Sequence, residues 1–168
     1  MLENVFIDSP LFGTPIPLAD VDDEIFSGGA AGKGVAIKNP DGRIVAPFGG
    51  KVQFIASPGV LGLKSFGGVE LLIHVGLNTC KLVGETFKPH VAAGDIITRG
   101  QVLLTFDPLE ISRAGFDATT PVVVTNPENF GDIVFGLGGR KVFVQRERFF
   151  FTPKKFLCYN LRGGVDYA

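Results

Sequence analysis

The stretch Gly68-Val69-Glu70-Leu71-Leu72-Ile73-His74-Val75-Gly76 decides the fold and carries the most informative side chain of the sequence. Its apolar and β-branched residues are typical of a strand buried in a sheet, and Gly76 ends the run. A histidine in such a strand lowers stability unless its nitrogens find hydrogen-bond partners or take part in chemistry. His74 is therefore either a core histidine bonded to neighbouring backbone or a reactive imidazole on a rigid strand.

Outward from this stretch, short apolar segments alternate with Gly and Pro turns along most of the chain. Residues 85–91 are expected to form one helical turn, while Asp107 and Pro108 begin a short helix that Gly115 ends. Strands are expected over residues 35–38, 43–46, 51–55, 60–64, 120–126 and 141–145. This spacing predicts an all-β fold, an antiparallel β-sandwich or barrel-sandwich hybrid with short helical turns.

The expected domain organisation is a lead-in over residues 1–20, one domain over 21–145, and a basic, aromatic tail over 146–168. Basic residues among aromatics can bind single-stranded nucleic acid, but the net charge of -1 offers no supporting basic surface, so a tail that covers the core is favoured. No apolar run approaches the roughly 20 residues that cross a bilayer, and the N-terminus lacks signal-peptide features. We therefore predict a cytoplasmic protein with no nucleic-acid partner and no membrane insertion.

Over residues 32–126 the sequence resembles the glucose-type enzyme IIA component of the bacterial phosphoenolpyruvate-dependent sugar phosphotransferase system. The matching segments, in order along the chain, are residues 32–38, 41–42, 45–47, 68–76, 106–107 and 120–126. The resemblance implies an antiparallel β-sandwich with a shallow apolar face around a phosphorylatable histidine, which His74 matches. It implies no cofactor.

The same resemblance implies the partners. The small carrier protein HPr would donate a phosphoryl group to His74, which would pass it to the IIB domain of a sugar transporter. The protein would thus be a phosphotransferase component with a phosphohistidine intermediate. Asp23, Ile25 and Phe26 match an acidic residue and an apolar rim that dock HPr, and regulated transporters or kinases are further implied partners. A neutral imidazole is a good nucleophile near pH 7, and an apolar rim protects phosphohistidine from water.

The sequence departs from the family pattern beside this site. Gly59 or Val60 stands where a second histidine is expected, and neither side chain can donate a hydrogen bond. An aspartate of the family is Asn78 here, next to Thr79, and Ser57 is a candidate substitute donor. Because one preorganised donor typically contributes about 2.7–4 kcal/mol to a transition state, onward transfer is expected to be weak. With half of the family's two-histidine metal site missing, no metal is expected.

Two alternatives remain, one of them a sugar-transporter IIA domain separated from its other domains, and two further resemblances are disfavoured. The most serious is a non-catalytic regulatory or binding protein that keeps the same scaffold without phosphotransfer. Residues 94–103 also look like the strand–turn unit of biotinyl and lipoyl carrier domains, whose modified lysine is usually flanked by methionine, whereas Met1 is the one methionine. The same unit resembles lysostaphin-type zinc peptidases, for which two histidines are too few.

Overall fold

The computed structural model describes residues 4–56, 59–82, 85–130, 133–135, 141–145, 157–159 and 165–167. The strands are β1 (Asn4–Asp8), β2 (Thr14–Pro17), β3 (Lys33–Lys38), β4 (Arg43–Val45), β5 (Gly50–Ala56), β6 (Val60–Ser65), β7 (Glu70–His74), β8 (Phe87–Pro89), β9 (Ile96–Ile97), β10 (Val102–Phe106), β11 (Thr120–Val124), β12 (Ile133–Phe135), β13 (Lys141–Gln145), β14 (Leu157–Tyr159) and β15 (Val165–Tyr167). The helices are α1 (Glu24–Ser27) and α2 (Pro108–Arg113), with 3-10 turns η1 (Leu18–Asp20), η2 (Thr79–Lys81) and η3 (Pro127–Asn129).

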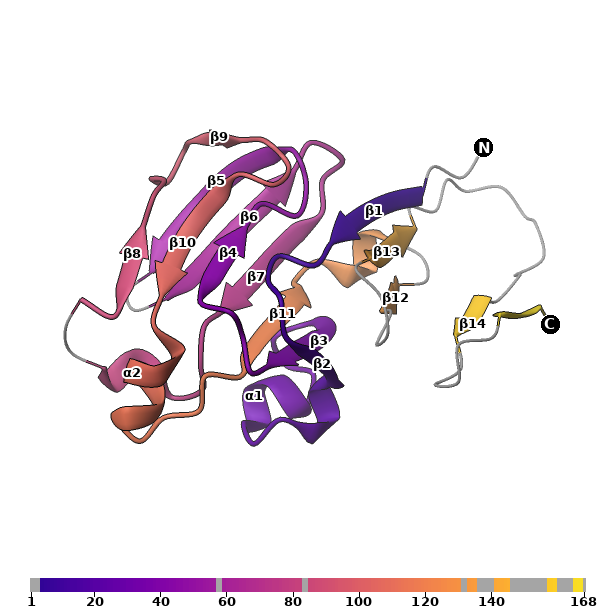
Figure 1. Ribbon diagram of the computed structural model, residues 1–168. Helices are drawn as coiled ribbons and strands as arrows, with labels where there is room; N and C mark the ends of the chain where they lie inside the picture. Colours follow the sequence, from indigo (N-terminus) through magenta and orange to yellow (C-terminus); the bar gives the residue numbers. More distant parts are fainter. Residues whose placement is uncertain are drawn as a thin grey trace.

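The main sheet has seven antiparallel strands in the order β2-β3-β11-β7-β6-β5-β9, which places β7 near its centre. A three-stranded sheet, β4-β10-β8, lies against one face of the main sheet, as Figure 1 shows. A second three-stranded sheet, β1-β13-β12, and the pair β14-β15 complete the strands that the structure describes. All of these pairings are antiparallel, which confirms the all-β fold expected from the sequence.

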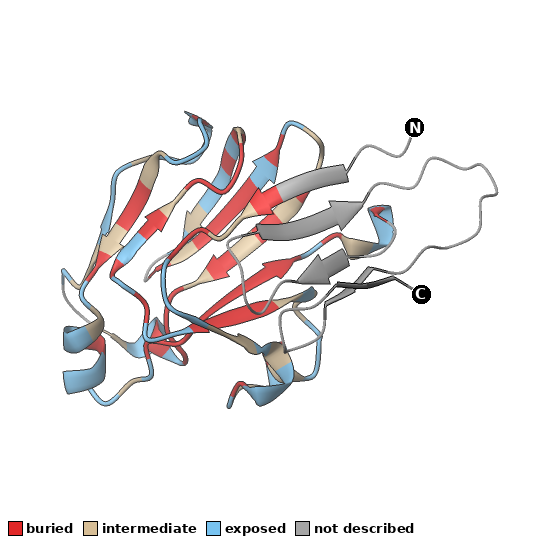
Figure 2. Ribbon diagram, turned by 45° about the vertical axis from the view of Figure 1, so that its right-hand side comes forward, coloured by how far each residue is buried: buried red, intermediate tan, exposed pale blue. Residues whose placement is uncertain are grey.

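The hydrophobic core lies between the main sheet and the β4-β10-β8 sheet. Alternate residues of a strand point to opposite faces, so one side of each central strand is buried in this layer. Leu61 and Leu63 of β6, Ile73 of β7, Ile44 of β4 and Leu103 of β10 are fully buried there. Figure 2 shows these buried stretches along the central strands. We call the opposite face of the main sheet the outer face.

One segment differs from the sequence expectation. Within residues 85–91 the chain forms strand β8, Phe87–Pro89, and not a helical turn, because Phe87 pairs with Phe106 of β10 and the two rings stack with centroids 6.5 Å apart. Within the expected lead-in, β2 pairs with β3 and so extends the main sheet. At β8, tertiary pairing overrides local propensity. The proposed boundaries at residues 20 and 145 remain predictions.

Helix α2 begins and ends as the sequence predicts. The carboxylate of Asp107 accepts hydrogen bonds from the amides of Leu109 and Glu110, at 2.8 and 3.3 Å. Pro108 occupies the first helical turn, where a missing N–H costs nothing. The helix ends at Arg113, two residues before Gly115, which adopts a φ of +87°.

Candidate functional site

His74 is the last residue of β7 and lies on the outer face of the main sheet. Leu71, Ile73 and Val75 point into the core, so His74 and Leu72 point the other way and are partly exposed. Val60 of β6 lies directly opposite His74 across the two strands. The imidazole is thus accessible, and it is carried by a strand that hydrogen-bonds to neighbours on both sides.

The turn after β7 orients the ring. Nδ1 of His74 lies 2.8 Å from the carbonyl oxygen of Gly76, which can only accept a hydrogen bond. The proton is therefore assigned to Nδ1, and Nε2 keeps its lone pair. Within the part of the chain that the structure describes, Nε2 has no hydrogen-bond partner. The ring is held by one nitrogen and leaves the other free to react.

Gly76 is required by the geometry of this turn. Its φ is +76°, and a Cβ added there would lie 2.4 Å from Cγ2 of Thr79 and 3.0 Å from the carbonyl oxygen of Asp117. Only glycine fits such a position without displacing its neighbours. The His-Val-Gly order in the sequence therefore places the Gly76 carbonyl within reach of the imidazole.

Thr79 and Asn78, which were expected to support the site, have structural roles in the same turn. Thr79 is fully buried, and its hydroxyl donates to the carbonyl oxygen of Val75 at 2.8 Å. Asn78 is exposed and adopts a left-handed conformation, with φ +56° and ψ +19°, which asparagine tolerates better than most residues. Thr79 fixes the turn from inside, and Asn78 lets the chain reverse direction.

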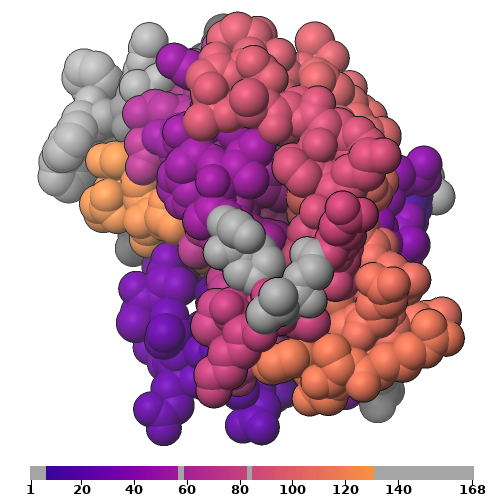
Figure 3. Space-filling model, turned by 90° about the vertical axis from the view of Figure 1, so that its left-hand side faces the viewer, coloured from indigo at the N-terminus to yellow at the C-terminus, as the bar shows by residue number. Residues whose placement is uncertain are grey.

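Helix α1 covers one side of the imidazole. The ring of Phe26 meets that of His74 edge to face, with centroids 5.6 Å apart and an interplanar angle of 66°. Phe26 is only 5% exposed and packs with Val21, Leu77 and other apolar residues on the outer face. Figure 3 shows the dark violet segment around α1 beside the magenta segment that follows β7, with the orange α2 segment further to the right. The site is therefore bordered by an apolar wall.

The three expected partner contacts occupy different environments in α1. The carboxylate of Asp23 caps the helix by accepting a hydrogen bond from the amide of Ile25 at 3.0 Å. The side chain of Ile25 is 61% exposed, while that of Phe26 is buried against the histidine. Of the three, Ile25 offers the most side-chain surface to another protein.

The β5–β6 side of the site has no second imidazole. Gly59 has a φ of +75°, and a Cβ there would lie 2.6 Å from the ring of Phe87 and 3.1 Å from Cβ of Val75, which is a core residue. Position 59 thus directs a side chain toward the core side and away from His74. Val60 is the residue that faces the imidazole. Ser57, the candidate substitute donor, lies outside the described residues.

Sequence reasoning missed the two contacts that define the ring's environment. The Gly76 carbonyl and the Phe26 ring were not connected to His74, although both residues were noted. The signal was available for Gly76, because a glycine two residues after a strand histidine permits the chain to fold back. Contact with Phe26 depends on tertiary packing between segments about 50 residues apart, and no local pattern encodes it.

Among the described residues, no three His, Cys, Asp or Glu side chains lie close enough together to hold a metal ion. The expectation of no metal remains a prediction. The same part of the chain contains no helix long and apolar enough to cross a membrane.

The family model for the phosphoenolpyruvate-dependent sugar phosphotransferase system, EIIA 1, matches residues 5–130. The beta-glucoside-specific EIIBCA component of Dickeya chrysanthemi is 46% identical over 123 residues, which cover 73% of this chain and 20% of that protein. The glucose-specific EIIBCA component of Corynebacterium glutamicum is 44% identical over 131 residues, 77% of this chain and 19% of that protein. The chain thus spans about a fifth of the length of these relatives.

A solved structure shares the fold. Glucose permease IIA from Mycoplasma capricolum matches with a TM-score of 0.72 and 28% identity, covering 85% of this chain and 96% of that one. The β-sandwich expected from the sequence resemblance is confirmed, and so is the phosphotransferase character of the domain. The chain belongs to the EIIA 1 family of the phosphoenolpyruvate-dependent sugar phosphotransferase system.

Proposed function

We propose that His74 carries a phosphoryl group on Nε2 as a covalent intermediate between two proteins. The single observation that carries this proposal is that the two ring nitrogens differ in their hydrogen bonding. Nδ1 is hydrogen-bonded to the Gly76 carbonyl, whereas Nε2 has no hydrogen-bond partner among the described residues. A lone pair on an accessible, oriented nitrogen is what a nucleophile needs.

The chemical step is an in-line phosphoryl exchange. Nε2 of His74 attacks the phosphorus of a phosphorylated donor protein, the bond from phosphorus to the donor nitrogen breaks, and the electron pair stays with the donor. Nε2 carries no proton, so none has to leave His74, and Nδ1 keeps its hydrogen bond to Gly76 throughout. The second exchange reverses these roles and returns the lone pair to Nε2.

The surrounding residues orient the ring and limit water. Phe26 packs edge-on against the imidazole, and Val60 faces it from the next strand. An apolar wall protects a phosphohistidine from hydrolysis until a partner covers the site. The donor is HPr and the acceptor is the IIB domain of a sugar transporter, both met in the cytoplasm. Asp23, Ile25 and Phe26 form one side of the docking surface, with Ile25 as the exposed contact.

This domain transfers its phosphoryl group onward less readily than a two-histidine site. Neither Val60 nor the backbone turn at Gly59 presents a side-chain donor toward Nε2. Ser57, which lies outside the described residues, or the acceptor protein then supplies the groups that stabilise the transferring phosphoryl oxygens. One absent donor corresponds to about 2.7–4 kcal/mol of transition-state stabilisation.

The test is incubation of the purified protein with phosphoenolpyruvate, enzyme I and HPr, followed by mass spectrometry and 31P NMR. Wild type should gain one acid-labile phosphoryl group on Nε2 of His74, and His74→Asn should gain none. His90→Asn is the matched control, because His90 is exposed and its Nε2 is bonded to the hydroxyl of Thr105 at 2.9 Å. If the wild-type protein stays unmodified, the phosphocarrier proposal is wrong, and the alternative of a regulatory or binding protein on the same scaffold is favoured.

A further inference from the structure

The outer face carries a row of lysines on the same side of the sheet as His74. The cross-strand register aligns Ile96 of β9, Lys51 of β5, Lys64 of β6 and Glu70 of β7 in one row. Paired residues share a face, and Lys64 alternates with Leu63, which is fully buried in the core. The lysine row therefore points outward, as His74 does.

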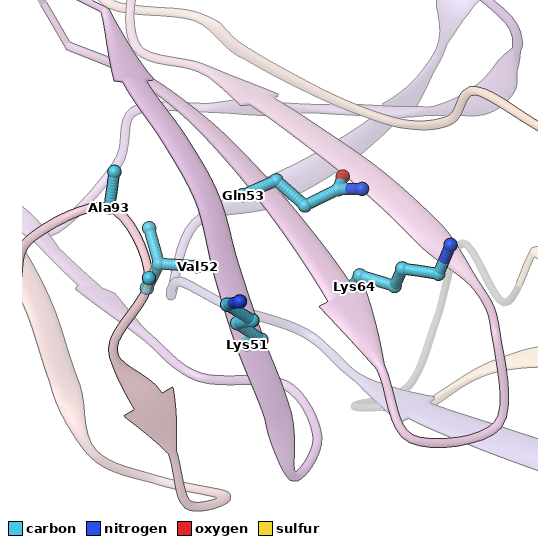
Figure 4. A pocket seen from close by; sticks show the side chains of 6 residues that line it. Lys51, Val52, Gln53, Lys64 and Ala93 are labelled. Carbon is cyan, nitrogen blue, oxygen red and sulfur yellow. The ribbon is translucent and has the colours of Figure 1, made fainter.

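The two lysines border an open groove. Lys51, Gln53 and Lys64 extend from β5 and β6, and Ala93 lies on the loop beside β5, as Figure 4 shows. Gly94 also lines the groove. The groove has a volume of about 580 Å³. It is large enough for several side chains of another protein.

The charges in this groove are only partly compensated. Lys64 pairs with Glu70 at 2.9 Å, and this hydrogen bond holds the pKa of the Glu70 carboxyl below its ordinary value. The Asp95 carboxylate accepts a hydrogen bond from the amide of Ala92. Lys51 makes no ion pair within the described residues, and the residue directly opposite it is another lysine, Lys64. Like charges in that arrangement repel, and an added carboxylate would relieve the repulsion.

Exposed apolar side chains lie beside the lysines. Ile96, next to Lys51 in the row, is 62% exposed, and Phe54 is 44% exposed over Gly62 in the adjacent row. The groove therefore combines ammonium groups with apolar surface. That combination suits an acidic protein segment with apolar side chains better than a small hydrophilic anion.

A protein that docks on His74 with an interface of ordinary size reaches this groove. Lys64 is four residues along β6 from Val60, which faces His74, so the two rows are roughly 13 Å apart. An interface of standard size covers about 800 Å² of each partner, equivalent to a disc of radius ~16 Å. A disc centred on His74 includes Lys64, and Lys51, which is two strands from β7, lies at its rim.

We propose that the protein docking on His74 places an acidic segment over Lys51 and Lys64, and that this contact sets the rotational orientation of the partner. The inference rests on the proposed role of His74. The opposite end of the docking surface is acidic, since Asp20, Asp22 and Glu24 are exposed around α1. A surface with one basic and one acidic end accepts a complementary partner in one orientation.

The test compares wild type with a double charge reversal, Lys51→Glu with Lys64→Glu. Two reactions are measured for each protein: phosphoryl transfer from phospho-HPr to the protein, and transfer from the phosphorylated protein to a IIB domain. KM for at least one of the two partners should rise roughly three- to thirtyfold at low salt, while kcat changes less than about twofold. The difference should shrink at about 0.5 M salt, where exposed charges are screened. Lys51→Glu alone, which breaks no ion pair, should show a smaller rise.

The matched control is the double reversal Arg43→Glu with Lys88→Glu, which makes the same charge change in the β4-β10-β8 sheet. Both residues are exposed and both lie opposite Thr105. An equal rise of KM in the control, or an unchanged KM for both partners in the lysine variant, would overturn the inference. Thermal melts of every variant check that it is folded.

A binding measurement separates this inference from the proposed function. Unphosphorylated HPr and the IIB domain are titrated separately into the 15N-labelled protein and followed by NMR. Amide shifts on β5 and β6 at the lysine row, lost in the double reversal, support the inference even if His74 takes no phosphoryl group. If neither partner causes these shifts, the inference about the lysine row is wrong even if His74 is phosphorylated.

Discussion

The two ends of the outer face differ in how their polar groups are held. At the His74 end, the contacts are short, directional and at least partly buried: imidazole to Gly76 carbonyl, and Thr79 hydroxyl to Val75 carbonyl. At the lysine end, the Lys64–Glu70 pair is open to water, with side chains 49% and 32% exposed. Buried hydrogen bonds fix geometry, whereas exposed charges contribute little stability and act mainly on association. The first end suits chemistry and the second suits recognition.

The largest expected effect comes from breaking the turn at the His74 end. Gly76→Ala combines a positive φ with a Cβ 2.4 Å from Cγ2 of Thr79, so the free energy of unfolding should fall by roughly 2–4 kcal/mol. Phosphoryl acceptance should fall as well, because the Gly76 carbonyl no longer orients the ring. Urea unfolding and the rate of labelling by phospho-HPr measure the two effects.

The control for that variant is Gly100→Ala. Gly100 also has a positive φ, +85°, but a Cβ there meets nothing within 4 Å. This substitution should lower the free energy of unfolding by about 1–2 kcal/mol through backbone strain alone, and the rate of phosphoryl labelling should not change. Equal losses of stability and labelling in both variants would show that the close contact at Gly76 is unimportant.

An intermediate effect should distinguish the two candidate positions for a second histidine. Val60→His places an imidazole opposite His74, with Cβ atoms about 4.5–5.5 Å apart, and should speed onward transfer to a IIB domain by at least about tenfold. Gly59→His should instead destabilise the fold by roughly 2–4 kcal/mol without that gain, because its side chain meets Phe87. Single-turnover transfer rates and urea unfolding separate the outcomes. Faster transfer in Gly59→His alone would show that position 59, and not Val60, faces His74.

The smallest effect concerns the lysine end and its pH dependence. The Glu70 pKa is lowered from an ordinary 4.5, mainly by the hydrogen bond from Lys64. A lowered folded-state pKa means that the pair stabilises the protein above the ordinary pKa and that this contribution is lost as pH falls through the lowered value. Because water reaches both side chains, which are 49% and 32% exposed, Lys64→Gln should lower the free energy of unfolding by at most about 0.5 kcal/mol at pH 7. Urea unfolding should show a smaller difference at pH 3 than at pH 7, and a difference that is as large in acid would contradict this origin.

Local sequence signals predicted much of the fold and the central residue of the site. The β7 run and its histidine, and the Asp107–Pro108 start of α2, were readable because alternation, capping and turn chemistry act over a few residues. The β8 strand was not, because its extended form depends on pairing with β10 and on the stacking of Phe87 with Phe106. The family resemblance showed that a second histidine is missing from the site, but it did not decide whether Gly59 or Val60 occupies its position.

The sequence by itself determined that a histidine would end a buried strand, that glycine would follow it, and that the chain would fold as an antiparallel sandwich. These outcomes depend on side-chain periodicity and on the backbone freedom of glycine, which are local properties. Only the tertiary structure decided that Phe26 borders the ring, and that Val60 faces it while position 59 turns toward the core. Those outcomes require segments distant in sequence to meet, and their relative placement is set by how the whole core packs.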